Sequence, residues 1–255
     1  MIIKPWDPPA ERVFFHKKKG RVPADLISIC VTNYNYAHFI EECLNSLADQ
    51  THQALDLIIV DDASTDPETD AILLPWLEEH KDRFYRVSFL VNPYNQGPSF
   101  SRNIAFNYAL GECVFIMDAD NTVYPTALAK HYDALNRGQF PAVYCQLEEF
   151  GDRNGIGQAD IWDTARMRKA NYIDVMALVR KDVWQQVGGF SHIEDGWEDY
   201  DFWMKFIDKG LEPGYLPEIL CRYRVHNASR TAREALIAHE RLELIMAFRH
   251  PAPEA

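Results

Sequence analysis

The amino-acid sequence predicts an α/β fold with a mostly parallel central sheet and helices on both of its faces. Short apolar runs rich in β-branched residues alternate with helical patterns through the first part of the chain. Buried strands that are separated by helices form parallel sheets with both faces covered. Polar clusters also follow several of these runs, and ligands of such sheets bind beyond the carboxyl ends of the strands. A ligand site is therefore expected at that edge.

The strands of the first part are continuous apolar runs, and the helices between them place apolar residues on one face. The predicted strands are 26–32, 55–62, 85–91, 113–118 and 141–147, and the predicted helices are 37–50, 68–81, 99–110 and 125–135. Gly111 stops the third helix, and Pro125 stands at a first-turn position of the fourth.

The second part is less regular. The glycine-rich, charged segment 148–170 is expected to be a long loop, which in a compact domain is usually functional. A strand, a short helix and a Gly-Gly turn are predicted within 171–190, a helix at 196–210 and a strand at 219–226. An amphipathic helix at 231–248 should pack on the body, with contact to a membrane or a partner as the alternative.

Composition restricts the classes of function. The chain has 255 residues, and its 26 basic and 38 acidic residues give a net charge of −12. Nucleic-acid binding is not expected, because such proteins usually carry the opposite charge. The five cysteines, Cys30, Cys43, Cys113, Cys145 and Cys221, show no metal-ligand spacing and are expected to be buried thiols.

The sequence shows neither a membrane span nor an N-terminal signal peptide. No apolar run is long enough for a membrane span, and the N-terminus lacks the apolar core of a signal peptide. We therefore expect residues 1–25 to be a leader packed on the domain or a linker, and the protein to be cytoplasmic. Peripheral association with a membrane is left open.

The stretch FIMDADNTVY sets Asp118 and Asp120 one residue apart at the end of a predicted buried strand. Carboxylates that close repel each other unless water or a cation lies between them. A hard divalent cation prefers carboxylate oxygens, so a metal site is one interpretation. The other is a solvated turn in which Asp118 caps the next helix.

Six motifs occur in an order that resembles the family 2 glycosyltransferases, which have a GT-A fold. They are VTNYNYAHFIEECLNSLADQ, IIVDDASTD, NQGPSFSRNIAFNYALGECVFIMDADN, VGGF, GWEDYDFW and YRVHNAS. The resemblance covers roughly residues 26–230. It implies a nucleotide-sugar-binding half at 26–121, an acceptor-binding half at 122–228 and a C-terminal helical extension at 229–255.

The resemblance implies a site for Mn²⁺ or Mg²⁺ that neutralises the diphosphate of the donor. Asp120 resembles the direct metal ligand of the family, and Asp118 would reach the metal through water or bind the ribose. His226 resembles the histidine that completes this site, although a lone histidine is more often structural. Arg222 or Arg224 would reach the pyrophosphate.

The nucleotide-sugar contacts implied by the resemblance come from several strand ends. Asp62 would contact the base, Thr32 and Tyr34 would complete the nucleoside pocket, Arg102 would contact the base or the phosphates, and Gly189 would approach the donor sugar. Four of these residues also have a structural interpretation that involves no ligand. It is helix capping near Asp62 and at Gly189, packing for Tyr34, and a salt bridge to a carboxylate for Arg102. Gly97, just before a helix, would allow an anion to approach.

The motif at 196–199 resembles the one that supplies the base of inverting transfer. Asp199 is the predicted base, Glu198 would orient the acceptor, and Asp201 is the second candidate for the base. Alternatively, all three carboxylates simply favour the positive helix N-terminus.

The resemblance implies an inverting, metal-dependent transferase that moves a sugar from a UDP-sugar to a hydroxyl of a saccharide or glycoconjugate, with dTDP and GDP sugars as alternative donors. One alternative is a non-catalytic module that binds a sugar nucleotide or polysaccharide. Another is a nucleotidyltransferase, which would carry a glycine-rich loop where this chain has TNYNYAHF.

Overall fold

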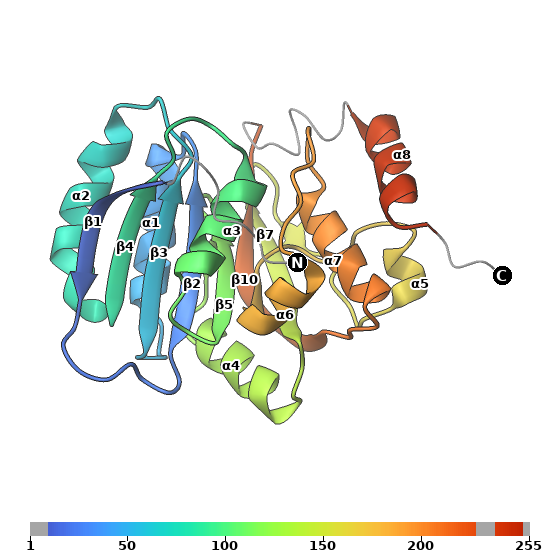
Figure 1. Ribbon diagram of the computed structural model, residues 1–255, viewed down its shortest axis with the longest axis horizontal. Coiled ribbons are helices and arrows are strands. Elements are labelled where there is room, and N and C mark those ends of the chain that lie inside the picture. Colours follow the sequence, from blue (N-terminus) through green and yellow to red (C-terminus); the bar gives the residue numbers. More distant parts are fainter. Residues whose placement is uncertain (1–9, 228–237, 252–255) are drawn as a thin grey trace.

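The computed structural model describes residues 10–227 and 238–251, and one mixed sheet runs through it (Figure 1). The strands lie in the order β1-β4-β3-β2-β5-β9-β7-β10-β6, with β8 paired to β7. They are β1 (Glu11–Lys17), β2 (Ile27–Asn33), β3 (Leu55–Asp61), β4 (Arg86–Val91), β5 (Cys113–Asp118), β6 (Thr122–Val123), β7 (Ala142–Gly151), β8 (Gly155–Ile156), β9 (Ala177–Arg180) and β10 (Gly214–Val225).

The sheet is mostly parallel, as predicted. The pairs β2–β3, β3–β4, β2–β5 and β7–β10 are parallel, whereas β1, β6 and β9 run antiparallel to their neighbours. The strands β2 and β3 are buried along their whole length. This burial on both faces explains why their sequences are mostly apolar and do not alternate strictly, with Ser28 and Asp56 as buried polar exceptions.

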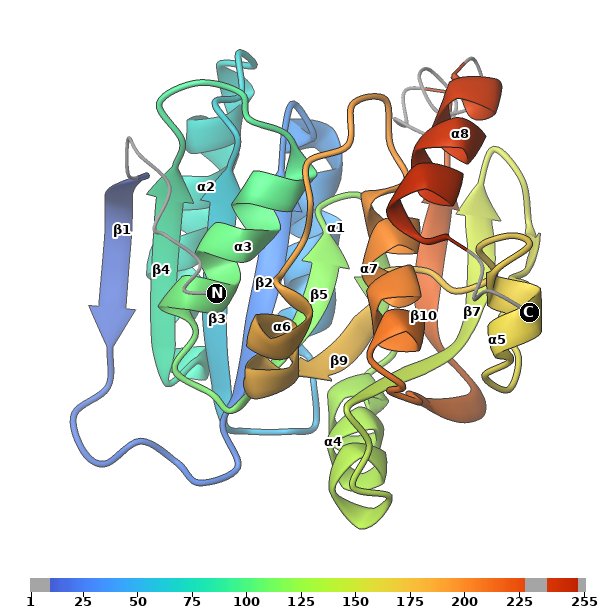
Figure 2. The same cartoon turned by 45° about the vertical axis from the view of Figure 1, so that its right-hand side comes forward.

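Helices cover both faces of the sheet (Figure 2). The buried residues of α1 (Ala37–Ala48), α2 (Glu68–His80) and α4 (Ala127–Arg137) join one apolar core, and a short 3₁₀ turn, η1 (Lys81–Arg83), follows α2. Those of α3 (Pro98–Tyr108), α6 (Lys181–Val187), α7 (Glu198–Asp208) and α8 (His239–Arg249) join the other. The predicted fold class is thereby confirmed.

Two segments differ from the prediction, and a third is described only in part. The segment 1–25 contains β1, an edge strand that pairs with β4. The residues of β1 are exposed or half-exposed. The predicted loop 148–170 contains the end of β7, the short strand β8 and the helix α5 (Thr164–Met167). The first part of the predicted helix 231–248 lies outside the described residues, and the described part is α8.

The helix α8 is held to α7 by a buried group of charges. Asp201 is fully buried, and its Oδ1 accepts hydrogen bonds from Arg249 Nε at 2.6 Å and His250 Nε2 at 3.0 Å. Its Oδ2 lies 3.0 Å from Lys205 Nζ. His250 Nδ1 also lies 2.5 Å from Asp208 Oδ2. Asp201, the second candidate for the base, is therefore a structural anchor with no open side toward a substrate.

We expect this anchor to make stability pH-dependent above neutrality. Burial lowers the pKa of His250, but its bonds to Asp201 and Asp208 raise it more, so the net pKa lies above the ordinary 6.5. A raised pKa stabilises the fold fully below 6.5, and this contribution is lost as the pH rises through the folded-state pKa. His250→Gln should lower the free energy of unfolding by about 1.5–3 kcal/mol below that pH and by less above it. Urea unfolding at a series of pH values measures the difference.

The matched control is His239→Gln, because His239 is also on α8 but is exposed, with an ion pair to Glu243 at the surface and its ring edge-on against Trp197. It should change stability little at any pH. Equal pH profiles for His250→Gln and the unchanged protein would contradict the assignment.

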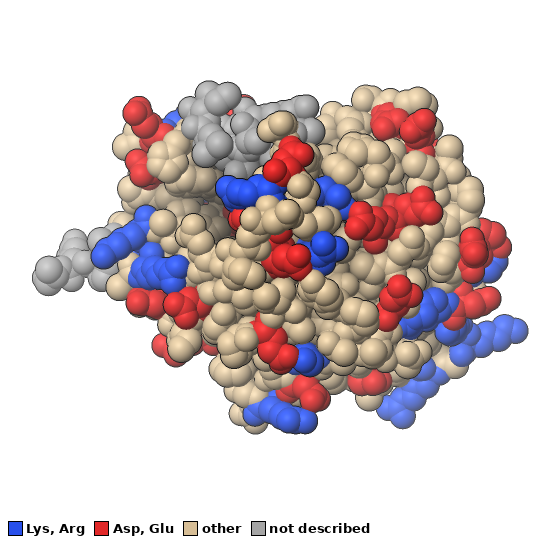
Figure 3. Space-filling model, turned by 180° about the vertical axis from the view of Figure 1, so that it is seen from behind, with Lys and Arg blue, Asp and Glu red and all other residues tan. Residues whose placement is uncertain are grey.

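The surface carries both signs of charge. On the face seen in Figure 3, acidic and basic side chains are interspersed. Within residues 10–227 and 238–251, no helix combines the length and apolar character needed to cross a bilayer.

Candidate functional site

The carboxyl ends of β2, β3 and β5 bring the predicted polar motifs together. Thr32 is in register with Asp118, and Asn33 with Asp61. Thr32 Oγ1 donates to Asp118 Oδ1 at 2.8 Å, and Asn33 Nδ2 donates to Asp61 Oδ2 at 2.6 Å. Three motifs far apart in sequence therefore share one edge, because parallel strands end on the same side of a sheet.

Asp62 is engaged by the chain itself. Its carboxylate accepts hydrogen bonds from Asn92 Nδ2 at 2.7 Å, from Gln96 N at 2.9 Å and from Gly97 N at 2.6 Å. Burial raises the pKa of Asp62, and these hydrogen bonds oppose the rise. The anion held before α3 is thus this carboxylate. Its contact with a base stays a prediction.

Asp120 and His226 form a close, buried pair. Asp120 Oδ2 lies 3.0 Å from His226 Nε2, and the side chains are only 10% and 9% exposed. The other ring nitrogen of His226 is buried and has no hydrogen-bond partner within the described ranges. Burial raises the pKa of Asp120, and the bond to His226 opposes this. Arg224 Nε donates to the Asp120 carbonyl at 2.8 Å and so fixes the backbone there.

This pair fits a divalent cation. A carboxylate and an imidazole are ligands of Mn²⁺ and related ions, and the two atoms are close enough to share one. Asp118 lies two residues before Asp120 and keeps a side-chain exposure of 27%. It caps no helix, because α4 begins after Thr126 without a side-chain cap. The chemistry of the Asp120–His226 pair therefore agrees with the predicted metal site, whereas the Asp118 carboxylate is bound by Thr32 and Arg102.

Arg102 connects the two halves of the site. Its guanidinium is 4% exposed; Nη2 donates to Asp118 Oδ1 at 2.8 Å, and Nη1 donates to Glu198 Oε1 at 3.0 Å. The structure therefore contains the salt bridges that the structural interpretation of Arg102 predicted. The bridge ties the end of β5 to the first turn of α7, so the donor-side carboxylate and the predicted acceptor-side motif keep a fixed relation.

Asp199 lies half-buried at the start of α7. Its Oδ2 accepts a hydrogen bond from Asn171 Nδ2 at 2.9 Å. Burial and then the charge of Glu198 raise the pKa of Asp199 to about 6, against the opposing charge of Arg102. A carboxylate of that pKa is ionised at neutral pH and is still basic enough to take a proton.

The backbone that leads into α7 is strained. Asp195 and Trp197 have positive φ angles of 71° and 64°, a region that non-glycine residues rarely occupy. Each such residue costs about 1–3 kcal/mol and persists where the surrounding structure requires it. The strain is consistent with a segment shaped for a site.

The remaining predicted residues lie in simpler surroundings. Tyr34 is 42% exposed, just beyond the end of β2. Gly189 has a φ of 69° and follows Gly188, which caps α6 in the left-handed conformation. The carbonyl of Gly189 accepts a bond from Lys205 Nζ at 2.6 Å. The helix-capping interpretation therefore describes this turn, and contact with a donor sugar stays a prediction.

Three residues near the site were missed from the sequence: Asn92, Asn171 and Asp174. Burial raises the pKa of Asp174 to about 7, and the charges of Asp118 and Asp199 add to the rise, so Asp174 lies within electrostatic reach of both. Its Oδ1 accepts a bond from Met176 N at 2.8 Å. No local pattern distinguishes these residues, because the site carboxylates that they approach are distant in sequence.

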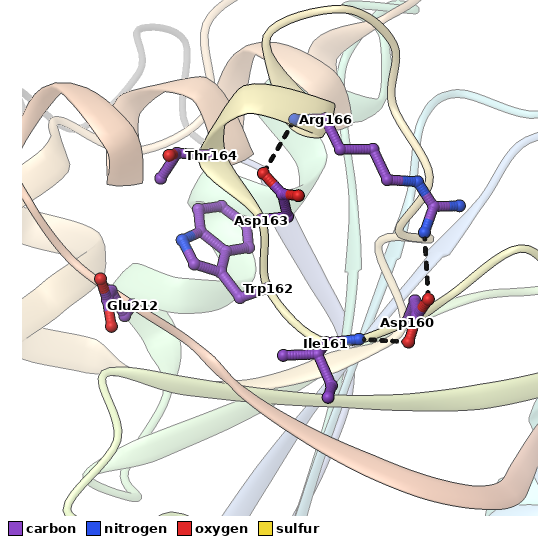
Figure 4. Close-up of a pocket in the computed structure, with 7 residues that line it drawn as sticks. All are labelled: Asp160, Ile161, Trp162, Asp163, Thr164, Arg166 and Glu212. Atoms are coloured by element: carbon purple, nitrogen blue, oxygen red, sulfur yellow. Dashed lines mark hydrogen bonds and ion pairs between the residues drawn. The ribbon is translucent and has the colours of Figure 1, made fainter.

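Cavities lie in parts of the second half of the chain as far as the structure describes it. One of about 470 Å³ is lined by the segment 160–166 and Glu212 (Figure 4), and none of the predicted site residues lines it. Another, of about 590 Å³, lies between α7, α8 and the segment 168–171. Its lining includes Asn171 and Trp197, so it reaches the neighbourhood of Asp199.

A comparison with known protein families bears on the function of this site. The model of a family described as glycosyl transferase family 2 matches residues 28–188, which is more than half of the chain. The chain belongs to glycosyl transferase family 2. The family resemblance and the enzyme class predicted from the sequence, a glycosyltransferase, are thereby confirmed.

Relatives in other organisms are glycosyltransferases, and solved structures share the fold. An uncharacterised glycosyltransferase of Haemophilus influenzae is 27% identical over 79% of this chain and 66% of its own length. Staphylococcus aureus TarS in complex with UDP-GlcNAc has a TM-score of 0.71 at 19% identity, covering 90% of this chain and 68% of that one. The mannosyltransferase PcManGT of Pyrobaculum calidifontis, with GDP-Man and Mn²⁺, has a TM-score of 0.64 at 24% identity, covering 90% and 63%. The chain thus spans about two thirds of these proteins, and the likeness to the two structures confirms the GT-A fold.

Proposed function

We propose that this family 2 chain transfers a sugar from a nucleoside diphosphate-sugar to a hydroxyl of a saccharide or glycoconjugate, with inversion at the anomeric carbon. UDP is the expected nucleotide. The observation that carries the proposal is the Arg102 bridge, which joins Asp118 at the donor edge to Glu198, beside Asp199. A donor at the sheet edge and an acceptor beside α7 would then meet across a fixed distance.

The donor side is proposed at the ends of β2, β3 and β5. Thr32, Tyr34 and Asp62 would surround the nucleoside, and Gly189 would lie against the sugar. Structures of TarS and PcManGT hold UDP-GlcNAc and GDP-Man, which supports the class of donor without deciding the base or the sugar. The net charge of −12 disfavours binding of a diphosphate, so a local positive charge is required.

Asp120 and His226 would hold that positive charge as Mn²⁺ or Mg²⁺, with Asp118 close by. When bound, such an ion acts as a Lewis acid that stabilises the charge of the departing diphosphate. The protein supplies these ligands as nearly buried side chains, whose surroundings make electrostatic attraction stronger than in water. Arg102 neutralises Asp118 and limits the repulsion between the acidic side chains.

Asp199 would act as the base. It would take the proton of the acceptor hydroxyl as that oxygen attacks the anomeric carbon, on the face opposite the departing nucleotide. Asn171 would hold the carboxylate in position through its hydrogen bond, and Glu198 would orient the acceptor. The cavity lined by Asn171 and Trp197 is the proposed entry of the acceptor, since an aromatic ring offers a flat apolar face to a sugar.

Metal removal tests the donor site. In calorimetry with a panel of UDP-, dTDP- and GDP-sugars, one nucleotide class should bind with Mn²⁺ present, and EDTA should abolish the heat. Asp120→Asn and His226→Gln should each weaken Mn²⁺-dependent binding by at least about 10–100-fold. Asp133→Asn, an exposed carboxylate on α4, is the control and should bind normally.

Two outcomes would contradict parts of this proposal. If a nucleotide-sugar bound equally well in EDTA, the metal would play no part in donor binding. Absence of binding for every nucleotide-sugar with Mn²⁺ present would overturn the donor class altogether.

A further inference from the structure

A second constellation of metal-binding side chains lies inside the protein, apart from the sheet edge. The ligand atoms of His131, Cys145 and Cys221 all lie within 4.8 Å of one another. Cys145 Sγ lies 3.4 Å from Cys221 Sγ. The three residues come from α4, β7 and β10, so only the fold brings them together.

The cluster is buried in apolar surroundings. His131 is 0% exposed, Cys145 5% and Cys221 1%. The ring of Phe115 packs edge-on against His131, with the ring centroids 5.4 Å apart. Leu128, Leu135 and Leu147 belong to the same core. Three groups with ligand atoms thus meet where packing alone would favour aliphatic side chains.

The imidazole of His131 is set up as a ligand. Its Nδ1 lies 2.8 Å from the carbonyl oxygen of Ala127. A carbonyl only accepts hydrogen bonds, so Nδ1 carries the proton and Nε2 of the neutral ring keeps its lone pair. Nε2 is buried and has no hydrogen-bond partner among the described residues. Metal-binding histidines commonly donate their other N–H to a backbone carbonyl in this way.

Charge decides which cation fits. Two thiolates and a neutral imidazole around a divalent ion form a group with no net charge, which an apolar core tolerates far better than an isolated ion. Thiolate and imidazole are ligands of zinc, whereas Mg²⁺ and Mn²⁺ prefer oxygen. We infer that His131, Cys145 and Cys221 bind Zn²⁺ as a structural site, separate from the donor metal.

Binding of the ion would deprotonate both thiols. Metal ligation deprotonates a coordinating cysteine, so the protons of Cys145 and Cys221 would leave as the zinc ion binds.

Metal analysis of the purified full-length chain tests the site. After growth with zinc and dialysis against EDTA to remove weakly held ions, the protein should retain one zinc ion per chain. Cys221→Ala should lose it. Cys113→Ala is the matched control, because Cys113 is also a buried cysteine of the sheet, and it should keep the zinc. Zinc retained by Cys221→Ala, or absent from the unchanged protein, would overturn the inference.

A second measurement needs no variant and so does not depend on the folding of Cys221→Ala. Zinc-edge X-ray absorption should detect sulfur neighbours at about 2.3 Å. Only nitrogen and oxygen neighbours would overturn the site. A mass two hydrogens lower under non-reducing conditions would also overturn it, since the pair would then be a disulfide. None of these readouts depends on sugar transfer.

Discussion

Asp199→Asn is expected to lower kcat by about 10²–10⁴-fold, the usual contribution of a general base. The amide keeps the size of the side chain and can still bond to Asn171, but it cannot accept the acceptor proton. Donor binding should persist, because Asp199 lies on the proposed acceptor side of the Arg102 bridge. Steady-state kinetics, with calorimetry of the nucleotide-sugar on the same sample, measures both.

The pH profile provides an independent sign of the same base. Because burial and Glu198 raise the pKa of Asp199 to about 6, kcat/KM should rise with pH through that value and level off above it. In Asp199→Asn the rise should vanish along with most of the activity.

The control is Glu194→Gln. Glu194 is an exposed carboxylate that precedes α7 and pairs with Arg241 at the surface. It should leave kcat and the pH profile unchanged. Full activity in Asp199→Asn would assign the base elsewhere, and Asp174, with a pKa of about 7, would then be the next residue to replace.

The buried part of the fold was readable from the sequence because burial leaves a simple pattern. The strands β2, β3 and β5 are buried along nearly their whole length and are mostly apolar, and the helices between them are amphipathic. The edge strand β1 was missed because it has no such pattern. Its residues are exposed or half-exposed, and its position depends on pairing with β4.

The acidic start of α7 shows where sequence reasoning about the site ends. Three carboxylates stand within four residues, and helix geometry separates them: Glu198 and Asp201, three apart, lie on one side, and Asp199 is turned away. In the structure Glu198 and Asp201 are buried against cations, and Asp199 is half-exposed. The sequence alone does not show that α8 closes over Asp201. This position of α8 makes Asp201 a structural anchor and leaves Asp199 as the candidate base.

Contacts between distant segments explain the other omissions. His131, Cys145 and Cys221 have no ligand spacing along the chain, so their meeting could not be predicted. The same holds for Asn171 beside Asp199, where a single asparagine in a loop gives no signal.

The largest effect on stability is expected at the opposite end of the sheet, at the buried pair of Arg86 and Asp56. Asp56 is 0% exposed and accepts bonds from Arg86 Nε at 2.6 Å, Ser28 Oγ at 2.6 Å and Leu110 N at 3.0 Å. Arg86→Met leaves this carboxylate buried without its cation. Breaking such a pair costs about 3–5 kcal/mol, against a total stability of about 5–15 kcal/mol for a typical protein. Urea unfolding measures the loss.

Two comparisons separate the buried charge from a general effect of losing arginine. Arg137→Met removes an exposed pair with Asp133, whose side chains are 81% and 63% exposed, and should cost at most about 1 kcal/mol. Adding Asp56→Asn to Arg86→Met should recover part of the loss, because an amide is less costly to bury than an unpaired carboxylate. If the double variant were no more stable than Arg86→Met, the unpaired charge would not be the cause. Donor affinity in the folded protein should stay unchanged throughout, since Asp56 and Arg86 pair at the end of β3 and β4 remote from Asp61 and the site.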